Sequence, residues 1–249
     1  FRSTKVKAGE NFSVFLNSDT SIWTTGSNTY GALGQNSVTH RSSPVQVGSG
    51  GGGAFYSSIS TGDSGHTLAV RTNGTLWAWG YNGYGQLGQN NTTSYSSPVQ
   101  VGSLTNWSTV FTPAVSQGSS AIKTDGTLWV WGNNGDGQLG LNDKTSRSSP
   151  VQVGTGTYTK VSMGWYYTIF LKSDGTIWGT GNNVRGNLGQ NNITNYSSPV
   201  QVGTDTTYTD IAAGGLSTYA IKSNGTLWAW GNNDSGELGQ SNLTWYSRS

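Results

Sequence analysis

The feature that most constrains this chain is a repeat with a period of about 50 residues. A fifteen-residue motif begins at residues 20, 74, 126, 175 and 225, and one clear copy reads GTLWAWGYNGYGQLG (74–88). A second motif, SPVQVG, ends at Gly48, Gly102, Gly154 and Gly203. Repeats of this length indicate units that bury their apolar faces against neighbouring units, so we expect a stack of similar parts.

Each unit predicts four short strands and no helix. Two apolar runs meet at an Asn-Gly or Asp-Gly pair, as in TYAIKSNGTLWAWG (218–231), and this pattern predicts a hairpin. The run TLWAWG is apolar without alternation, as expected of a strand that is covered on both faces. We therefore predict an all-β chain that forms a β-propeller of five four-stranded repeats of about 50 residues.

The repeats predict a single propeller domain over residues 1–249. The predicted repeat boundaries are 1–48, 49–102, 103–154, 155–203 and 204–249, and the last repeat lacks its SPVQVG strand. The first residue is Phe1 instead of Met, which favours a processed product or an excerpt of a longer array. A closed five-bladed ring is the alternative to an excerpt.

The motifs GTLWAWGYNGYGQLG, SSPVQVG (96–102) and GDSGHTLAV (62–70) together resemble the repeat of the regulator of chromosome condensation family. All five units match. The resemblance implies a seven-bladed propeller that binds other proteins, and this chain would then form part of such a ring. The Asn, Thr, Ser and Gly content resembles repeats of bacterial or phage surface proteins, which implies an extracellular, virion or cell-surface location.

Composition argues against several classes of function. Only 10% of residues are charged and the net charge is +2, so we expect no nucleic-acid partner. No apolar run reaches the roughly 18 residues that span a bilayer, so we expect no membrane insertion. Cysteine is absent, and the two histidines, His40 and His66, lie outside any metal-binding spacing. Asp125 and Asp174 share turn positions with asparagines, which indicates turn chemistry. We predict a protein that is not an enzyme and has no cofactor.

The leading candidate site is a position that holds Tyr or Arg in every unit. Nine residues separate the last glycine of the longer motif from the proline of SPVQVG, and the seventh of them is planar in each copy. The set is Arg41, Tyr95, Arg147, Tyr196 and Tyr246, with Trp245 beside the last. Because such side chains dominate recognition surfaces, we predict a ring that binds a protein partner or a surface glycan. The alternative is that each side chain covers the loop beneath it.

A second candidate position lies among the glycines of the longer motif. It changes from unit to unit and holds Tyr30, Tyr84, Asp136, Arg185 and Ser235. We expect these side chains to be exposed at a turn, where they either contact a partner or are free of constraint.

Two tryptophan columns and one column of cations also recur. The first column is Trp23, Trp77, Trp129, Trp178 and Trp228, and the second is Thr25, Trp79, Trp131, Thr180 and Trp230. We expect both to pack between blades, with a sugar-stacking platform as the alternative. Asn17, Arg71, Lys123, Lys172 and Lys222 precede the hairpin turns. We expect solvated strand ends there, with a basic ring for an anionic partner as the alternative.

These observations predict a non-enzymatic structural or adhesive module on a phage particle or bacterial surface. It would bind protein partners through its loop face, as part of a larger assembly. The alternative is a lectin that binds glycans at one weak site per blade and combines them by multivalency.

Overall fold

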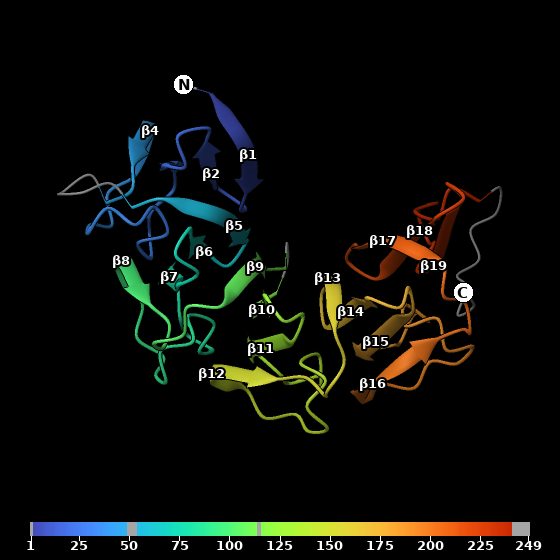
Figure 1. The fold of residues 1–249 in the computed structure, drawn as a ribbon. Coiled ribbons are helices and arrows are strands. Elements are labelled where there is room, and N and C mark those ends of the chain that lie inside the picture. Colours follow the sequence, from blue (N-terminus) through green and yellow to red (C-terminus); the bar gives the residue numbers. More distant parts are fainter. Residues whose placement is uncertain (1, 49–53, 114–115, 241–249) are drawn as a thin grey trace. The chain divides into compact units, whose positions relative to one another are not determined.

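The computed structural model describes residues 2–48, 54–113 and 116–240. These residues form 19 strands in five sheets, and no helix occurs among them (Figure 1). The described segments therefore include no helix of the length and apolarity needed to span a membrane.

The five sheets follow one another along the chain, and we number them blades 1 to 5. Blade 1 contains β1 (Ser3–Ala8), β2 (Phe12–Asn17), β3 (Ile22–Gly26) and β4 (Arg41–Gln46). Blade 2 contains β5 (Tyr56–Gly62), β6 (His66–Arg71), β7 (Leu76–Gly80) and β8 (Tyr95–Gln100). Blade 3 contains β9 (Trp107–Phe111), β10 (Gly118–Lys123), β11 (Leu128–Gly132) and β12 (Arg147–Gln152). Blade 4 contains β13 (Tyr158–Met163), β14 (Tyr167–Lys172), β15 (Ile177–Gly181) and β16 (Tyr196–Val202), and blade 5 contains β17 (Tyr208–Ala213), β18 (Ser217–Lys222) and β19 (Leu227–Gly231).

Within every blade each strand pairs with the next one along the chain. The hairpin predicted for residues 218–231 forms, with β18 and β19 antiparallel and Ile221 opposite Leu227. The predicted all-β architecture of repeated short-stranded sheets is thus confirmed. Blade 5 has three strands within the described ranges.

The chain divides into two compact units, and the division passes through the segment of blade 3. One unit comprises Phe1–Asp125, Trp129–Asn133 and Ser146–Val151, and the other comprises Gly126–Leu128, Asn134–Thr145 and Gln152–Ser249. That residues 1–249 form one propeller domain with the repeat boundaries given above stays a prediction.

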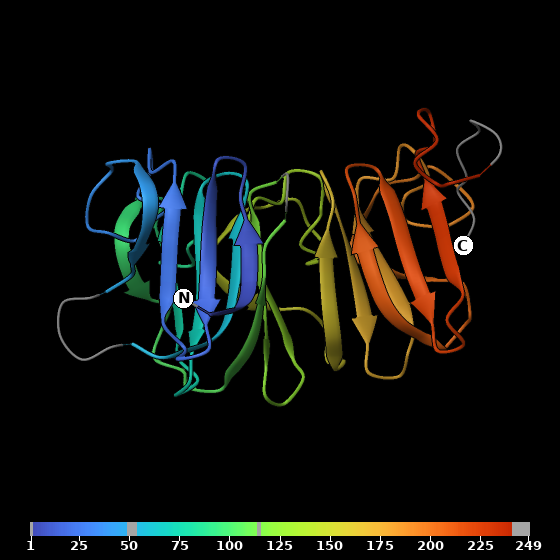
Figure 2. The same ribbon diagram turned by 90° about the horizontal axis from the view of Figure 1, so that it is seen from above.

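The connections of each blade lie at the two opposite ends of its strands (Figure 2). The two ends therefore carry different turns and loops. We call the first the loop end. It carries the turn between strands one and two and the long connection between strands three and four. We call the second the hairpin end, and it carries the turn between strands two and three, which contains Asn-Gly or Asp-Gly in blades 2 to 5 and Asp19-Thr20 in blade 1.

The core is formed by blade faces that pack on each other. One cluster combines Leu68, Leu76 and Leu87 of blade 2 with Val110 and Trp131 of blade 3, and all five side chains are buried. Trp79 belongs to a separate cluster with blade 1. The strand is thus covered on both faces, and TLWAWG does not alternate because Leu76, Ala78 and Trp79 are all completely buried.

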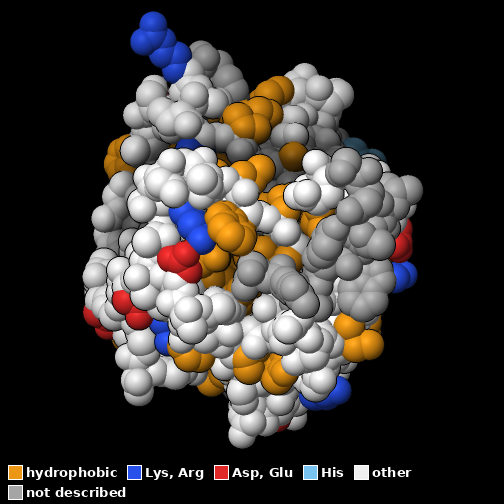
Figure 3. Space-filling view, turned by 90° about the vertical axis from the view of Figure 1, so that its right-hand side faces the viewer, with side chains coloured by type: hydrophobic (Ala, Val, Ile, Leu, Met, Phe, Trp, Pro, Cys, Tyr) orange, Lys and Arg blue, Asp and Glu red, His pale blue; other side chains and the backbone are white. Residues whose placement is uncertain are grey.

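One face of blade 5 is more open than the matching face of the other blades. Leu227 is 67% exposed, whereas the equivalent residues Leu76, Leu128 and Ile177 are 0% exposed. Ile221 and Trp228 beside it are also exposed. Figure 3 looks onto the side of the molecule that bears β17–β19, and hydrophobic side chains are visible there beside lysine and acidic groups. An apolar face of this kind normally contacts another protein surface.

The glycine that ends β7 shows why the motif reads WG. Gly80 has a φ of +99°, and a Cβ at this residue would lie 2.2 Å from the carbonyl oxygen of Gly65. Any other residue would therefore clash with the neighbouring turn as well as strain the backbone. The glycine lets the chain leave the third strand and enter the long connection at the loop end.

Candidate functional site

The long connection at the loop end is fixed by one buried asparagine in each blade. Its Oδ1 accepts a hydrogen bond from the backbone N–H five residues later, at 2.8–2.9 Å in every copy. The five residues, all 0% exposed, are Asn28, Asn82, Asn134, Asn183 and Asn233. In blade 2 the Nδ2 group of Asn82 also donates to the carbonyl oxygens of Asn91 and Thr93. The loop is therefore a rigid support, because its backbone polar groups are bound to a buried side chain.

Our sequence analysis overlooked these asparagines. The signal was present, because this position is Asn in all five copies while the residue two places later varies freely. An invariant polar residue indicates a structural support. A variable residue two places later indicates the side chain that the support presents.

The second candidate position does lie at the exposed part of this loop. Tyr30 is 49% exposed and Tyr84 is 43% exposed. Asp136 and Arg185 are half-buried, because each contacts a polar neighbour. Asn182 Nδ2 lies 3.5 Å from Asp136 Oδ1, and an Arg185 guanidinium nitrogen lies 3.4 Å from an Asp234 carboxylate oxygen. The five blades therefore present four kinds of side chain on the same support, with tyrosine in blades 1 and 2.

The leading candidate residues lie at the first position of the fourth strand instead of in a free loop. Arg41, Tyr95, Arg147 and Tyr196 begin β4, β8, β12 and β16, and all four are half-buried. The hydroxyl oxygens of Tyr95 and Tyr196 accept hydrogen bonds from Asn91 and Asn192 at 3.2 and 3.0 Å. Both rings also pack against a hydrophobic core cluster. This geometry fits the alternative in which the rings cover their own loops, and partner binding by this set stays a prediction. Tyr246 and Trp245 lie outside the described residues.

The second tryptophan column joins adjacent blades, as expected. Trp79, Trp131 and Trp230 are 0% exposed. Their indole N–H groups donate to the carbonyl oxygens of Ala32, Gln86 and Asn187 in the preceding blade, at 2.8, 2.8 and 3.0 Å. Thr180 makes the same connection through its hydroxyl, which donates to the carbonyl oxygen of Gly137. These aromatics are structural and are closed to a ligand.

In the first tryptophan column, Trp77 and Trp129 pack against core clusters that join adjacent blades, as expected. In blades 2 to 5 the ring also stacks with the cation that precedes its own hairpin turn. The ring centroids of Trp77, Trp129, Trp178 and Trp228 lie 3.5–3.8 Å from the charged groups of Arg71, Lys123, Lys172 and Lys222. A second ring centroid lies 5.0–5.8 Å from each cation. These second rings come from the first residue of the blade: Tyr56, Trp107, Tyr158 and Tyr208.

The cations are therefore not freely solvated, and Lys222 also pairs with the carboxylate of Asp205. Lys123 is 7% exposed, and burial lowers the pKa of its ammonium group, an effect that nearby Asp125 opposes. In blade 1 the same register pairs Ser3 with Asn17, and the Ser3 hydroxyl donates to Asn17 Oδ1. In blade 1, Ser3 thus replaces the aromatic residue of the first strand and Asn17 replaces the cation. Because both are replaced together, we infer that the two residues act as one structural unit.

We expect the substitution Lys172→Met to lower the free energy of unfolding by about 1 kcal/mol, because it removes a cation that contacts the ring of Trp178. Lys144→Met is the matched control, since Lys144 is exposed and lies in the same unit. Urea denaturation of both variants measures the difference. Equal stability of the two variants would show that the stacked cation contributes nothing.

Catalytic candidates find no support in the geometry. Two hydrogen bonds from Thr176, to its carboxylate oxygen, lower the pKa of Asp174, so this residue shapes a turn. His66 is completely buried, and its Nε2 lies 3.2 Å from the hydroxyl of Ser119. Across the described part of the chain, no three His, Asp or Glu side chains gather in a group that could hold a metal ion.

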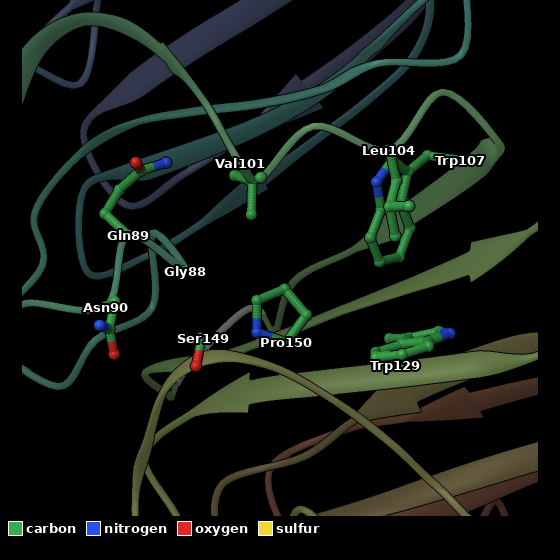
Figure 4. A pocket seen from close by; sticks show the side chains of 10 residues that line it. Gly88, Gln89, Asn90, Val101, Leu104, Trp107, Trp129, Ser149 and Pro150 are labelled. Atoms are coloured by element: carbon green, nitrogen blue, oxygen red, sulfur yellow. The ribbon is translucent and has the colours of Figure 1, made fainter.

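A pocket of about 390 Å³ lies between blades 2 and 3, within one compact unit. Figure 4 shows Trp107 and Leu104 on one side of it, Trp129 and Pro150 on the other, and Val101 facing the same space. No charged side chain lines it. The pocket offers apolar contact area, with Gln89, Asn90 and Ser149 as its polar side chains.

Comparisons with known proteins come from sequence and from structure. A family model described as the RCC1-like domain matches residues 2–246. The ultraviolet-B receptor UVR8 of Arabidopsis thaliana is 32% identical over 174 residues, which cover 68% of this chain and 38% of the receptor. The mitochondrial RCC1 domain-containing protein RUG3 of the same plant is 31% identical over 149 residues, covering 59% of this chain and 33% of RUG3.

The fold also matches yeast RCC1 (Prp20), solved with Kap60 bound. The TM-score is 0.85 at 18% identity, and the match covers 99% of this chain and 60% of the yeast protein. The predicted β-propeller is thereby confirmed. This chain spans little more than a third of the length of the two Arabidopsis proteins. The expected extracellular, virion or cell-surface location is wrong, because the relatives found include a mitochondrial protein.

Proposed function

We propose that this chain, which belongs to the RCC1-like domain family, is a protein-docking propeller whose partner binds at the loop ends of its blades. One observation carries the proposal. At the loop end, a buried asparagine holds each long connection rigid, and the connection presents tyrosine in blades 1 and 2 and a different polar side chain in each later blade. The repeated aromatics of the second tryptophan column are engaged inside the fold, whereas Tyr30 and Tyr84 are exposed.

Two further points support a protein as the partner. Rigid aromatic side chains give large contact areas at low entropic cost, which suits protein interfaces. The yeast relative is solved as a complex with a protein, Kap60. No group of the described site has the arrangement of a catalytic centre, so we propose a binding role without catalysis. The narrower prediction of a structural or adhesive role stays a prediction.

A photo-reactive amino acid placed at Tyr84 tests the proposal in cells of the source organism. The matched control places it at Thr105, which is also exposed and lies in the same unit, in the connection between β8 and β9. We expect one protein to become cross-linked from position 84 and not from position 105. Cross-linking from position 105 alone would place the partner elsewhere and overturn the proposal.

The glycan alternative has less support, because the hydroxyls of Tyr95 and Tyr196 already bind asparagine side chains. A glycan array distinguishes a protein-docking function from a glycan-binding function. We expect no saturable binding by the folded chain. Saturable binding that disappears when Tyr95, Tyr196 and Tyr246 are replaced by alanine would favour the lectin.

A further inference from the structure

A second pocket lies at the loop end of blades 1 and 2, and its volume is about 320 Å³. We call it the Tyr30 pocket. Glu10 reaches it from the turn between β1 and β2, Tyr30 from the connection between β3 and β4, and Asp63 from the turn between β5 and β6. Three segments far apart in sequence thus bring one aromatic ring and two carboxylates to a single hollow.

The ring of Tyr30 is held in place although half of the residue is exposed. Its centroid lies 4.8 Å from that of Tyr81, with the planes inclined by 50°. The ring also borders Gly65, where a Cβ would lie 3.6 Å from a Tyr30 ring carbon. A ring fixed by two neighbours needs little ordering when a ligand stacks on it.

The two carboxylates have no cation to balance them. Neither Glu10 nor Asp63 makes an ion pair or a side-chain hydrogen bond within the described part of the chain. Partial burial raises the pKa of Asp63, and the negative charge of Glu10 raises it further. Two negative charges in one hollow repel each other, and a bound cation would relieve this repulsion.

We propose that the Tyr30 pocket receives an arginine side chain of the protein partner, an inference that rests on the proposed docking function. A guanidinium group stacks on an aromatic face and donates paired hydrogen bonds to a carboxylate at the same time. The pocket offers both kinds of contact. A sugar would stack on Tyr30 equally well, but it would leave the repulsion between Glu10 and Asp63 in place. The unbalanced charge therefore favours the cation.

The test uses the whole chain and the peptide acetyl-Gly-Arg-Gly-amide, with the matched citrulline peptide as the uncharged control. Binding is followed by NMR titration of the Tyr30 ring and nearby backbone signals. We expect weak saturable binding of the arginine peptide and at least a fivefold weaker affinity for the citrulline peptide. The double variant Glu10→Gln, Asp63→Asn should lose the binding, whereas Asp174→Asn, which removes a carboxylate from a hairpin turn of the other unit, should keep it.

Three outcomes would overturn the inference. They are equal affinity for the citrulline peptide, undiminished binding by the double variant, or no perturbation of Tyr30 at millimolar peptide. Each leaves the docking function intact, since cross-linking from position 84 tests that function separately. Failure of the cross-linking experiment together with arginine binding would instead assign the pocket to a ligand other than the proposed partner.

Discussion

We expect the substitution Trp131→Ala to lower the free energy of unfolding of its unit by about 4 kcal/mol. This is the usual cost of deleting a large aromatic side chain that is buried. The indole is 0% exposed and belongs to the cluster that joins blades 2 and 3. Its N–H donates to the carbonyl oxygen of Gln86 at 2.8 Å, so the substitution also removes a donor from a buried acceptor. Both effects act at the contact between the two blades.

The matched control for Trp131→Ala is Trp77→Ala in the first tryptophan column of the same unit. Trp77 is only half-buried, and its indole N–H binds Thr75 within its own hairpin. We expect a smaller loss there, about 2 kcal/mol. Denaturation monitored by circular dichroism measures both. If Trp77→Ala proved as costly as Trp131→Ala, the contact between blades would not be the special feature of the second column.

Acid should destabilise the unit that contains His66. Burial lowers the pKa of this histidine from 6.5 to about 4, and Nδ1 has no hydrogen-bond partner. Above pH 6.5 both the folded and the unfolded histidine are neutral, and its contribution to stability is complete. As the pH falls from 6.5 towards 4, the unfolded chain binds a proton that the folded chain does not. Stability is therefore lost across this window, by about 2 kcal/mol at pH 5 and about 3 kcal/mol in total.

A pair of histidine variants separates this effect from the titration of carboxylates. His66→Gln should remove most of the loss between pH 7 and pH 5, whereas His40→Gln should retain it because that variant keeps His66. The free energy of unfolding of each variant, measured in urea at several pH values, provides the comparison. A His66→Gln variant with the same pH dependence as the parent chain would show that His66 is not the group responsible.

Internal repetition made the fold predictable, because five copies of one pattern report the same local structure five times. The hairpin at 218–231 and the covered strand TLWAWG both followed from residue type and order alone. The second tryptophan column was also placed correctly, since a large apolar residue on a strand covered on both faces packs against the next blade.

The candidate site was harder to predict, because exposure depends on contacts between residues that are distant in sequence. The sequence pattern predicted that Tyr95 and Tyr196 are exposed recognition residues. In the structure each begins a strand and accepts a hydrogen bond from an asparagine four residues earlier. Arg71 and its equivalents read as solvated charges, yet a ring from the first strand of the blade lies against each of them. The Tyr30 pocket combines three segments, and no spacing within the sequence indicates that they meet.

The hydrogen bonds of the second tryptophan column run in one direction, and this direction limits how such a protein can change in evolution. Each donor side chain reaches the blade that precedes it, and each acceptor carbonyl serves the blade that follows. Duplication or loss of one whole unit preserves every donor and acceptor pair. Duplication or loss of only part of a unit leaves a buried carbonyl without its donor at one junction. We therefore expect lineages of such chains to gain and lose length in steps of one complete repeat.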